Sequence, residues 1–193
     1  MMELKTRQLE IIESAGRLLT QKGINGLTIK NLAKEMNFSE SAIYRHFESK
    51  EEIIVALLKY LDKNIDKRIL SMQRSGNALV DLKNLFSEQF VFFSQHNHFV
   101  VAVFSEGLME ESPLINQAIQ SLIATMAKHL TEIVRQGQAQ ETIRNDISTE
   151  HLVQIILGAY KLYMFKWRLN NFSYNLNNEG SKLVDSLLQI IRY

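Results

Sequence analysis

The spacing of apolar residues predicts helices from one end of the chain to the other. Between residues 6 and 22 the apolar side chains fall on one helical stripe, and a glycine follows as a stop signal. Thr28 is suited to cap a short helix over Ile29–Met36, and Ser39 is suited to cap a second one over about Glu40–Phe47. Asn37 stands between them, where a tight turn favours a residue that tolerates the left-handed region. The pattern therefore predicts two short helices joined by a sharp turn.

A longer series of helices follows. Residues 49–52 have the S-x-x-E pattern of a capping box, which opens a long helix through about Arg74. Five more helices are expected over about 79–95, 99–110, 113–136, 149–170 and 181–192, and the polar stretch 175–180 is expected to be a turn. The 193 residues contain a single proline, Pro113, which disfavours a fold with many strands and turns. The sequence therefore predicts an all-α protein.

Two of these helices are more apolar than a surface helix requires. Between residues 149 and 169 apolar side chains cover more than one face, and the last helix carries two adjacent apolar stripes. A helix that is apolar nearly all round is buried on more than one side, and in a short chain the second side can be a partner subunit. We expect a homodimer interface that includes Leu152, Ile156, Leu183, Leu187 and Ile191.

Composition and charge narrow the class of protein only slightly. Hydrophobic residues make up 46% and charged residues 22%, which is ordinary for a globular protein, and the lack of cysteine excludes disulfides and thiolate chemistry. The net charge is +1, with 13 basic against 10 acidic side chains in residues 1–75 and 9 against 11 in residues 76–193. This weak asymmetry is compatible with an N-terminal part that meets a polyanion. We expect no signal peptide and no membrane span, and a cytoplasmic protein.

The second short helix carries the strongest functional signal. Its inward residues would lock it against the preceding helix, while Ser41, Tyr44, Arg45 and His46 point outward and Ser39 stands at the leading end. Hydroxyl and guanidinium donors on one exposed face suit a DNA major groove and its phosphates. Helical hairpins with a solvated polar face are also common, so the spacing alone leaves both possibilities open.

A longer string of residues extends this pattern, namely Thr28-Ile29-x-x-Leu32-Ala33 and then Phe38-Ser39-x-Ser41-Ala42-Ile43-Tyr44-Arg45-His46-Phe47-x-Ser49-Lys50-Glu51-Glu52-Ile53. This string resembles the DNA-binding domain of the tetracycline-repressor (TetR) family over about residues 6–58. Asn37 stands where the family usually has glycine, and Glu48 stands where proline is frequent. The resemblance implies an all-α homodimer, with a three-helix helix-turn-helix DNA-binding domain over 1–50. A C-terminal bundle of about six helices over 51–193 would serve ligand binding and dimerisation.

The resemblance also implies a role for individual residues at DNA. Phosphate contacts are expected from Thr28, Tyr44, His46 and Lys50, with Lys30 adding to them. Base contacts are expected from Ser39, Glu40, Ser41, Ala42 and Arg45, and Arg45 is best suited to a guanine. Glu40 can accept from a cytosine amino group or stabilise the helix N-terminus, and we favour the second role.

The C-terminal half is expected to hold a pocket for a small apolar effector. Aromatic and methionine side chains are frequent there, and the expected lining is Phe90, Phe93, Phe104, Met126, Tyr160, Tyr163 and Met164. Gln89 and His129 are among the polar groups available to it. The alternative for each of these residues is that it only fills the core.

Other chemistry has little support. The H-x-H spacing of His96 and His98, with Glu106, Glu110 and Glu111 downstream, is a weak metal signal without a close third ligand, and we expect no metal and no cofactor. No nucleophile–base motif or phosphate-binding glycine loop is present, so we do not expect an enzyme. The preferred interpretation is a ligand-responsive repressor that binds a palindromic operator as a dimer. The alternative is a helical dimer that binds small molecules or proteins without specific DNA recognition.

Overall fold

The computed structural model describes residues 5–104, 108 and 112–193. Regular structure in these residues is helical, and the one pairing of β type is an isolated antiparallel bridge between Ile143 and Arg192. The described residues form two compact units, one made of the chain up to Asp62 with His98–Leu122 and the other of Lys63–Asn97 with Ile123–Tyr193. The prediction of an all-α fold is confirmed.

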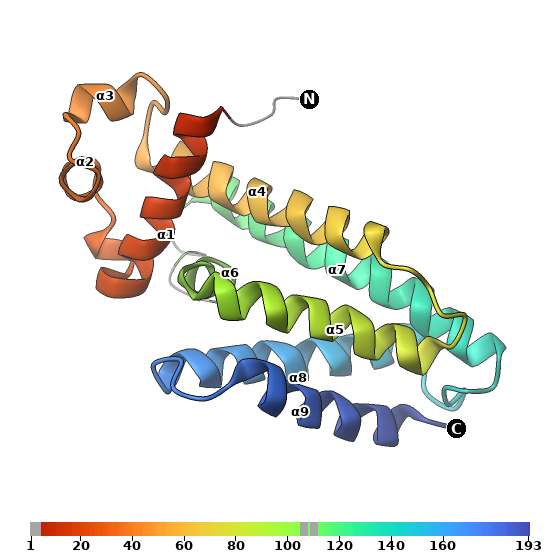
Figure 1. Cartoon of the computed structure of the whole chain (residues 1–193). Coiled ribbons are helices and arrows are strands. Elements are labelled where there is room, and N and C mark those ends of the chain that lie inside the picture. The colour runs from red at the N-terminus through yellow and green to blue at the C-terminus, as the bar shows by residue number, and fades with distance from the viewer. Residues whose placement is uncertain (1–4, 105–107, 109–111) are drawn as a thin grey trace. The chain divides into compact units, whose positions relative to one another are not determined.

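The first unit contains the short helices near the N-terminus (Figure 1). It comprises α1 (Thr6–Gly26), α2 (Ile29–Glu35), α3 (Glu40–Tyr44), the first part of α4 (Lys50–Ser71), the 3-10 turn η1 (Asn97–Phe99), α6 (Val100–Phe104) and the beginning of α7 (Pro113–Ala139). Unlike the other helical residues of α1, Gly23 has a positive φ of 67°, so the regular helix stops where the sequence predicts.

Side-chain caps and one strained turn define the two short helices. The Thr28 hydroxyl accepts from the Asn31 amide at 3.1 Å, and the Ser39 hydroxyl accepts from the Ala42 amide at 3.2 Å. Asn37 has a φ of 55°, the left-handed conformation that its position in the sequence predicts. These three features confirm the predicted helix–turn–helix geometry.

The capping box before α4 closes with a shift of one residue. The Glu52 amide donates to the Ser49 hydroxyl at 3.1 Å, as expected, whereas the Glu52 carboxylate accepts from the backbone amide of Glu48 at 2.6 Å instead of that of Ser49. Both bonds satisfy backbone donors that precede or open the helix, so the chain enters α4 with a defined geometry.

The second unit is a helical bundle. It contains the rest of α4 and α7 with α5 (Ala78–Gln95), α8 (Thr149–Leu169) and α9 (Leu176–Ile191), and α5, α8 and α9 lie together in Figure 1. Gly180 makes the approach of α9 to α5 possible, because a Cβ at this position would lie 2.6 Å from the Phe90 ring. The Ser148 cap of α8 is as predicted, with its hydroxyl accepting from the His151 amide at 3.2 Å.

Several helix boundaries differ from the sequence prediction. The helix expected over about Glu40–Phe47 is observed as α3, which ends at Tyr44, so Arg45 and His46 follow the helix instead of belonging to it. The polar stretch 175–180 is not a turn, since α9 begins at Leu176 after the Asn175 side chain accepts from the Asn178 amide. Leu176 is buried, and its burial outweighs the low helix propensity of the residues that follow. The helix expected over 99–110 is observed as η1 and α6, and residues 105–107 and 109–111 lie outside the described part. Within the helices that the structure describes, none combines the length and apolar character needed to cross a membrane.

Candidate nucleic-acid interface and effector region

The helix α3 is fixed from its inner side. Ile43 and Phe47 are buried, as are Leu32 and Ala33 of the preceding helix. Each large apolar side chain that is fully buried contributes roughly 1.5–3 kcal/mol, which is enough to hold a five-residue helix that would not form alone. The orientation of α3 is therefore set by its core contacts, and its other face is left to solvent.

The predicted DNA-binding residues lie on exposed parts of this unit. The exposed ones are Thr28, Lys30, Ser39, Glu40, Ser41, Tyr44 and Arg45, while Ala42, His46 and Lys50 are half-buried. Tyr44 keeps 50% of its surface exposed although it is a large aromatic residue. Ser39 caps the helix, and its hydroxyl lies 2.9 Å from that of Ser41, so the leading end carries two linked hydroxyls. One surface thus combines hydroxyl, phenol and guanidinium donors.

A contact from α1 adds a cation that the sequence analysis did not identify. The Arg7 guanidinium lies over the Phe38 ring, with its Cζ 5.0 Å from the ring centroid, and it also pairs with Glu10. The neighbouring Gln8 amide donates to the His46 carbonyl at 3.4 Å. The start of α1 therefore packs beside the turns that flank α3. In the sequence, Arg7 stands in the polar first turn of an amphipathic helix. Such turns are common, so the sequence alone did not single out this arginine.

Most of the predicted effector residues are buried in the second unit. Phe90, Phe93, Met126, Tyr160 and Met164 are buried, and Tyr163 is half-buried. The Tyr160 ring centroid lies 5.8 Å from that of Phe90, and the Tyr163 centroid lies 6.2 Å from it. Phe104 is also buried, but it belongs to the first unit. The structure thus brings Phe90, Tyr160 and Tyr163 into one aromatic cluster.

Polar groups adjoin this aromatic cluster. Arg68 donates from Nη2 to the Gln89 Oε1 at 3.1 Å, and its Cζ lies 3.8 Å from the centroid of the Phe92 ring. Burial raises the pKa of Tyr160, and the positive charge of Arg68 partly opposes that rise. Burial likewise raises the pKa of Tyr163, so both phenols stay protonated near neutral pH and can donate hydrogen bonds.

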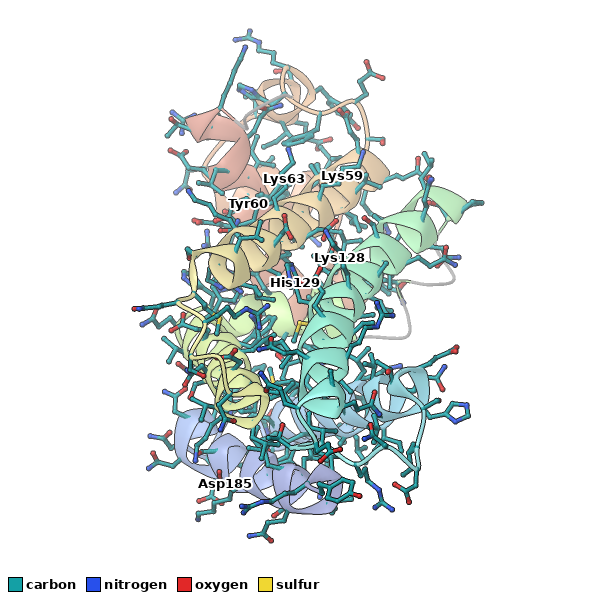
Figure 2. All side chains as sticks on the ribbon, turned by 90° about the vertical axis from the view of Figure 1, so that its right-hand side faces the viewer. Lys59, Tyr60, Lys63, Lys128, His129 and Asp185 are labelled. Atoms are coloured by element: carbon teal, nitrogen blue, oxygen red, sulfur yellow. The ribbon has the colours of Figure 1, made fainter. Side chains whose placement is uncertain are left out.

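A second buried polar pair connects α7 with α4. The His129 Nε2 lies 2.8 Å from the Asp66 Oδ1, and the histidine is almost fully buried while the aspartate side chain is partly exposed. Figure 2 shows His129 directed inward from α7, next to the exposed Lys128. His129 therefore lies in the interior of this unit with Asp66 as its partner.

The histidines of the H-x-H motif pack on aromatic rings. The His96 ring centroid lies 4.9 Å from that of Phe92, and the His98 centroid lies 4.2 Å from that of Phe99. In the described part of the chain, no group of three or more His, Cys, Asp or Glu side chains is placed to hold a metal ion. Glu106, Glu110 and Glu111 lie outside the described residues.

The residues expected at a dimer interface lie mostly inside the protomer. Leu152, Ile156, Leu187 and Ile191 are buried and Leu183 is half-buried. The exposed apolar side chains of α8 lie on another face of the helix and are Ile155, Leu162, Phe165 and Leu169, with exposed fractions of 49%, 59%, 38% and 63%. Their spacing is that of one helical stripe, and Gly158 on the same stripe has open space around it. The helix α8 therefore offers an exposed apolar surface, but it is made of residues other than those expected from the sequence.

A capped helix-turn-helix with an exposed face of donors is a motif of DNA-binding proteins, and here it is joined in one chain to a helical unit with a buried aromatic cluster. Comparison with protein families agrees. Residues 11–57 match the family model described as "Bacterial regulatory proteins, tetR family", and residues 79–175 match "Tetracyclin repressor-like, C-terminal domain". The chain belongs to the TetR family of transcriptional regulators.

Individual relatives are distant in sequence. The chain is 24% identical over 170 residues to the nucleoid occlusion factor SlmA of Vibrio atlanticus, covering 87% of each chain. It is 23% identical over 194 residues to the probable acrEF/envCD operon repressor of Escherichia coli K12, covering 97% of this chain and 87% of that one. The solved structure of the transcriptional regulator FadR of Bacillus subtilis in complex with stearoyl-CoA has a TM-score of 0.75 at 20% identity, over 96% of this chain and 97% of that one.

Proposed function

We propose that the protein is a ligand-responsive repressor that binds a palindromic operator as a homodimer and is released by a small effector with an apolar body. In this proposal residues 1–50 recognise DNA and residues 51–193 bind the effector and form the dimer. The observation that carries it is the exposed donor face of α3, held by the caps at Thr28 and Ser39 and by the left-handed turn at Asn37.

The side chains on the exposed face of α3 support two kinds of DNA contact, some to bases and others to phosphates. Arg45 follows the last helical residue and is exposed, so its guanidinium can reach a base edge, and a bidentate contact to guanine would give sequence preference. Tyr44 and Lys30 carry donors that suit phosphates, which position the protein without reading sequence. Glu40 lies in the first turn of α3, where a carboxylate stabilises the helix.

The effector proposal depends on the second unit. Phe90, Tyr160 and Tyr163 form an aromatic cluster next to the Arg68–Gln89 pair, and such a mixture of apolar walls and a few polar groups is typical of small-molecule sites. The structurally similar FadR was solved with stearoyl-CoA, which supports an effector with a long apolar part.

The dimer proposal depends on the exposed stripe of α8. Ile155, Leu162, Phe165 and Leu169 form a continuous apolar face that a monomer would leave in water, and covering such a face is a main driving force for association. Two copies that pair through this face would present two α3 helices to one palindrome.

DNA binding can be tested by fluorescence anisotropy on a palindrome flanking the gene and on a random duplex of equal length. Arg45→Ala is expected to narrow the gap between the two affinities by about 1–3 kcal/mol, because a base contact is lost. Tyr44→Phe is expected to weaken both affinities alike, because phosphates are the same in every sequence. Lys83→Ala removes a positive charge from α5 and serves as the control that leaves both affinities unchanged. Equal affinity of the wild type for both duplexes would refute specific recognition.

A second candidate function follows from the likeness to the nucleoid occlusion factor. Under this alternative the protein would act in nucleoid occlusion instead of repression. Transcript measurement in a strain that lacks the gene separates the two functions, since only the loss of a repressor is expected to raise the transcripts of its target genes.

A further inference from the structure

Among the residues that the structure describes, the interior of the second unit contains a buried amide whose nitrogen has no hydrogen-bond partner. The Gln89 side chain is only 1% exposed, and its Oε1 accepts from Arg68. Arginine has donors only, so the atom facing it must be the oxygen, and the Nε2 is then directed elsewhere. This nitrogen has no hydrogen-bond partner among the described residues. A buried donor left without an acceptor is costly, and proteins keep one where a ligand or an ordered water supplies the acceptor.

Arg68 adjoins this amide, and the Tyr160 phenol is a second donor in the same unit. The Arg68 guanidinium carbon lies 3.8 Å from the centroid of the Phe92 ring, a cation–π contact that restrains the side chain. The Tyr160 phenol is buried, and burial raises its pKa, so it is protonated at neutral pH. The positive charge of Arg68 acts on the same pKa in the opposite direction. The surroundings are apolar, since the Phe86 ring lies 5.2 Å and the Phe90 ring 5.8 Å from that of Tyr160. A cation and neutral donors with aromatic walls favour a negatively charged acceptor that is attached to an apolar body.

We propose that Arg68 and Gln89 bind the carboxylate of an amphipathic effector whose apolar chain packs against Phe86, Phe90 and Tyr160. This inference deepens the effector part of the proposed function and depends on it for its biological meaning. It predicts a preference for anionic over neutral compounds of equal chain length. A purely apolar effector would leave the Gln89 amide without an acceptor.

Three probes with the same ten-carbon chain test the head group, namely decanoate, 1-decanol and decyltrimethylammonium. Isothermal titration calorimetry on the full chain gives the dissociation constant of each. Decanoate is expected to bind at least about tenfold more tightly than decanol, because hydrogen bonds to a charged acceptor are the stronger ones. Decyltrimethylammonium is expected to bind more weakly than both, because its charge is repelled by Arg68.

Substitutions then assign the preference to particular side chains. Arg68→Met is expected to raise the dissociation constant of decanoate about tenfold, while that of decanol changes less than about threefold. Lys67→Met is the matched control, since it removes the same charge from the neighbouring, exposed position of α4 and should leave both constants unchanged. Gln89→Glu covers the case in which Arg68→Met does not fold. The new carboxylate would pair with Arg68 and repel the anion, so decanoate should again bind at least about tenfold more weakly.

The outcomes separate this inference from the proposed function. Equal binding of decanoate and decanol, no binding of decanoate, or an equal loss in Lys67→Met and Arg68→Met would overturn the inference. If decanol alone bound and released labelled operator DNA, the repressor proposal would stand and the carboxylate site would be wrong. If decanoate bound through Arg68 without changing operator affinity, the site would stand and the effector role would fail.

Discussion

Substitution of Gly180 tests the packing that forms the effector region. Gly180 lies inside α9, where alanine would normally stabilise the helix by about 1 kcal/mol. The added Cβ, however, would lie 2.6, 2.7 and 2.8 Å from three atoms of the Phe90 ring. Carbon atoms prefer separations of about 3.5–4.0 Å, so the ring or the helix would have to move by about 1 Å. Phe90 is buried and packs on Tyr160 and Tyr163, which restricts the movement of its ring.

The expected result for Gly180→Ala is a loss of stability. Overpacking a filled core costs about 1–3 kcal/mol, and the gain in helix propensity offsets about 1 kcal/mol of it, so we expect a net loss of up to about 2 kcal/mol. Urea unfolding at one fixed protein concentration measures it, because the stability of a dimer depends on concentration. Ser181→Ala, at the neighbouring position of α9, is the control and should change stability by less than about 0.5 kcal/mol.

A double substitution distinguishes this clash from other effects of the methyl group. In a Phe90→Leu background the ring edge is absent, so the additional cost of Gly180→Ala should fall or change sign. A Gly180→Ala protein that is more stable than the wild type by the full helix-propensity gain of about 1 kcal/mol would show that α9 and Phe90 are not packed as described.

Three further predictions concern the turn, the cap and the dimer. Asn37 has a φ of 55°, so Asn37→Gly should be tolerated, whereas Asn37→Val should cost at least about 1 kcal/mol in thermal unfolding; equal stability of both would contradict the left-handed turn. Ser39→Ala should lower the stability by about 1 kcal/mol because the Ala42 amide loses the hydroxyl acceptor and keeps only the Ser39 carbonyl, and an unchanged unfolding midpoint would contradict the cap. Leu162→Glu should yield monomers in sedimentation velocity, whereas Val91→Glu, at an exposed apolar position of α5, should remain dimeric; a wild type that is monomeric at micromolar concentration would refute the proposed interface.

Local signals made the N-terminal part predictable from the sequence. A cap needs only a hydroxyl at the right distance from an amide three residues on, so Thr28 and Ser39 could be identified directly. The left-handed turn at Asn37 also depends on one residue type at one position. Such signals act within a few residues, so they can be recognised without knowing which distant segments meet.

The parts that were mispredicted or missed depend on contacts between distant segments. The start of α9 was placed at residue 181 because 175–180 are polar, yet the burial of Leu176 extends the helix by a turn. The apolar excess of α8 was recognised, but periodicity could not show that Leu152 faces the interior and Leu162 the solvent. Gln89 was named as a polar group, but its partner Arg68 lies 21 residues away on another helix.

Selection of DNA from a random pool by the purified wild-type protein would decide whether the protein recognises a specific operator. A dimer with two α3 helices should enrich a palindrome whose half-sites are about one helical turn, roughly 34–36 Å, apart. Affinity for the enriched duplex should exceed that for random DNA by at least about 10³-fold at physiological salt, and the effector should lower it. A pool that enriches no common sequence, with binding that depends only on salt, would contradict specific operator recognition.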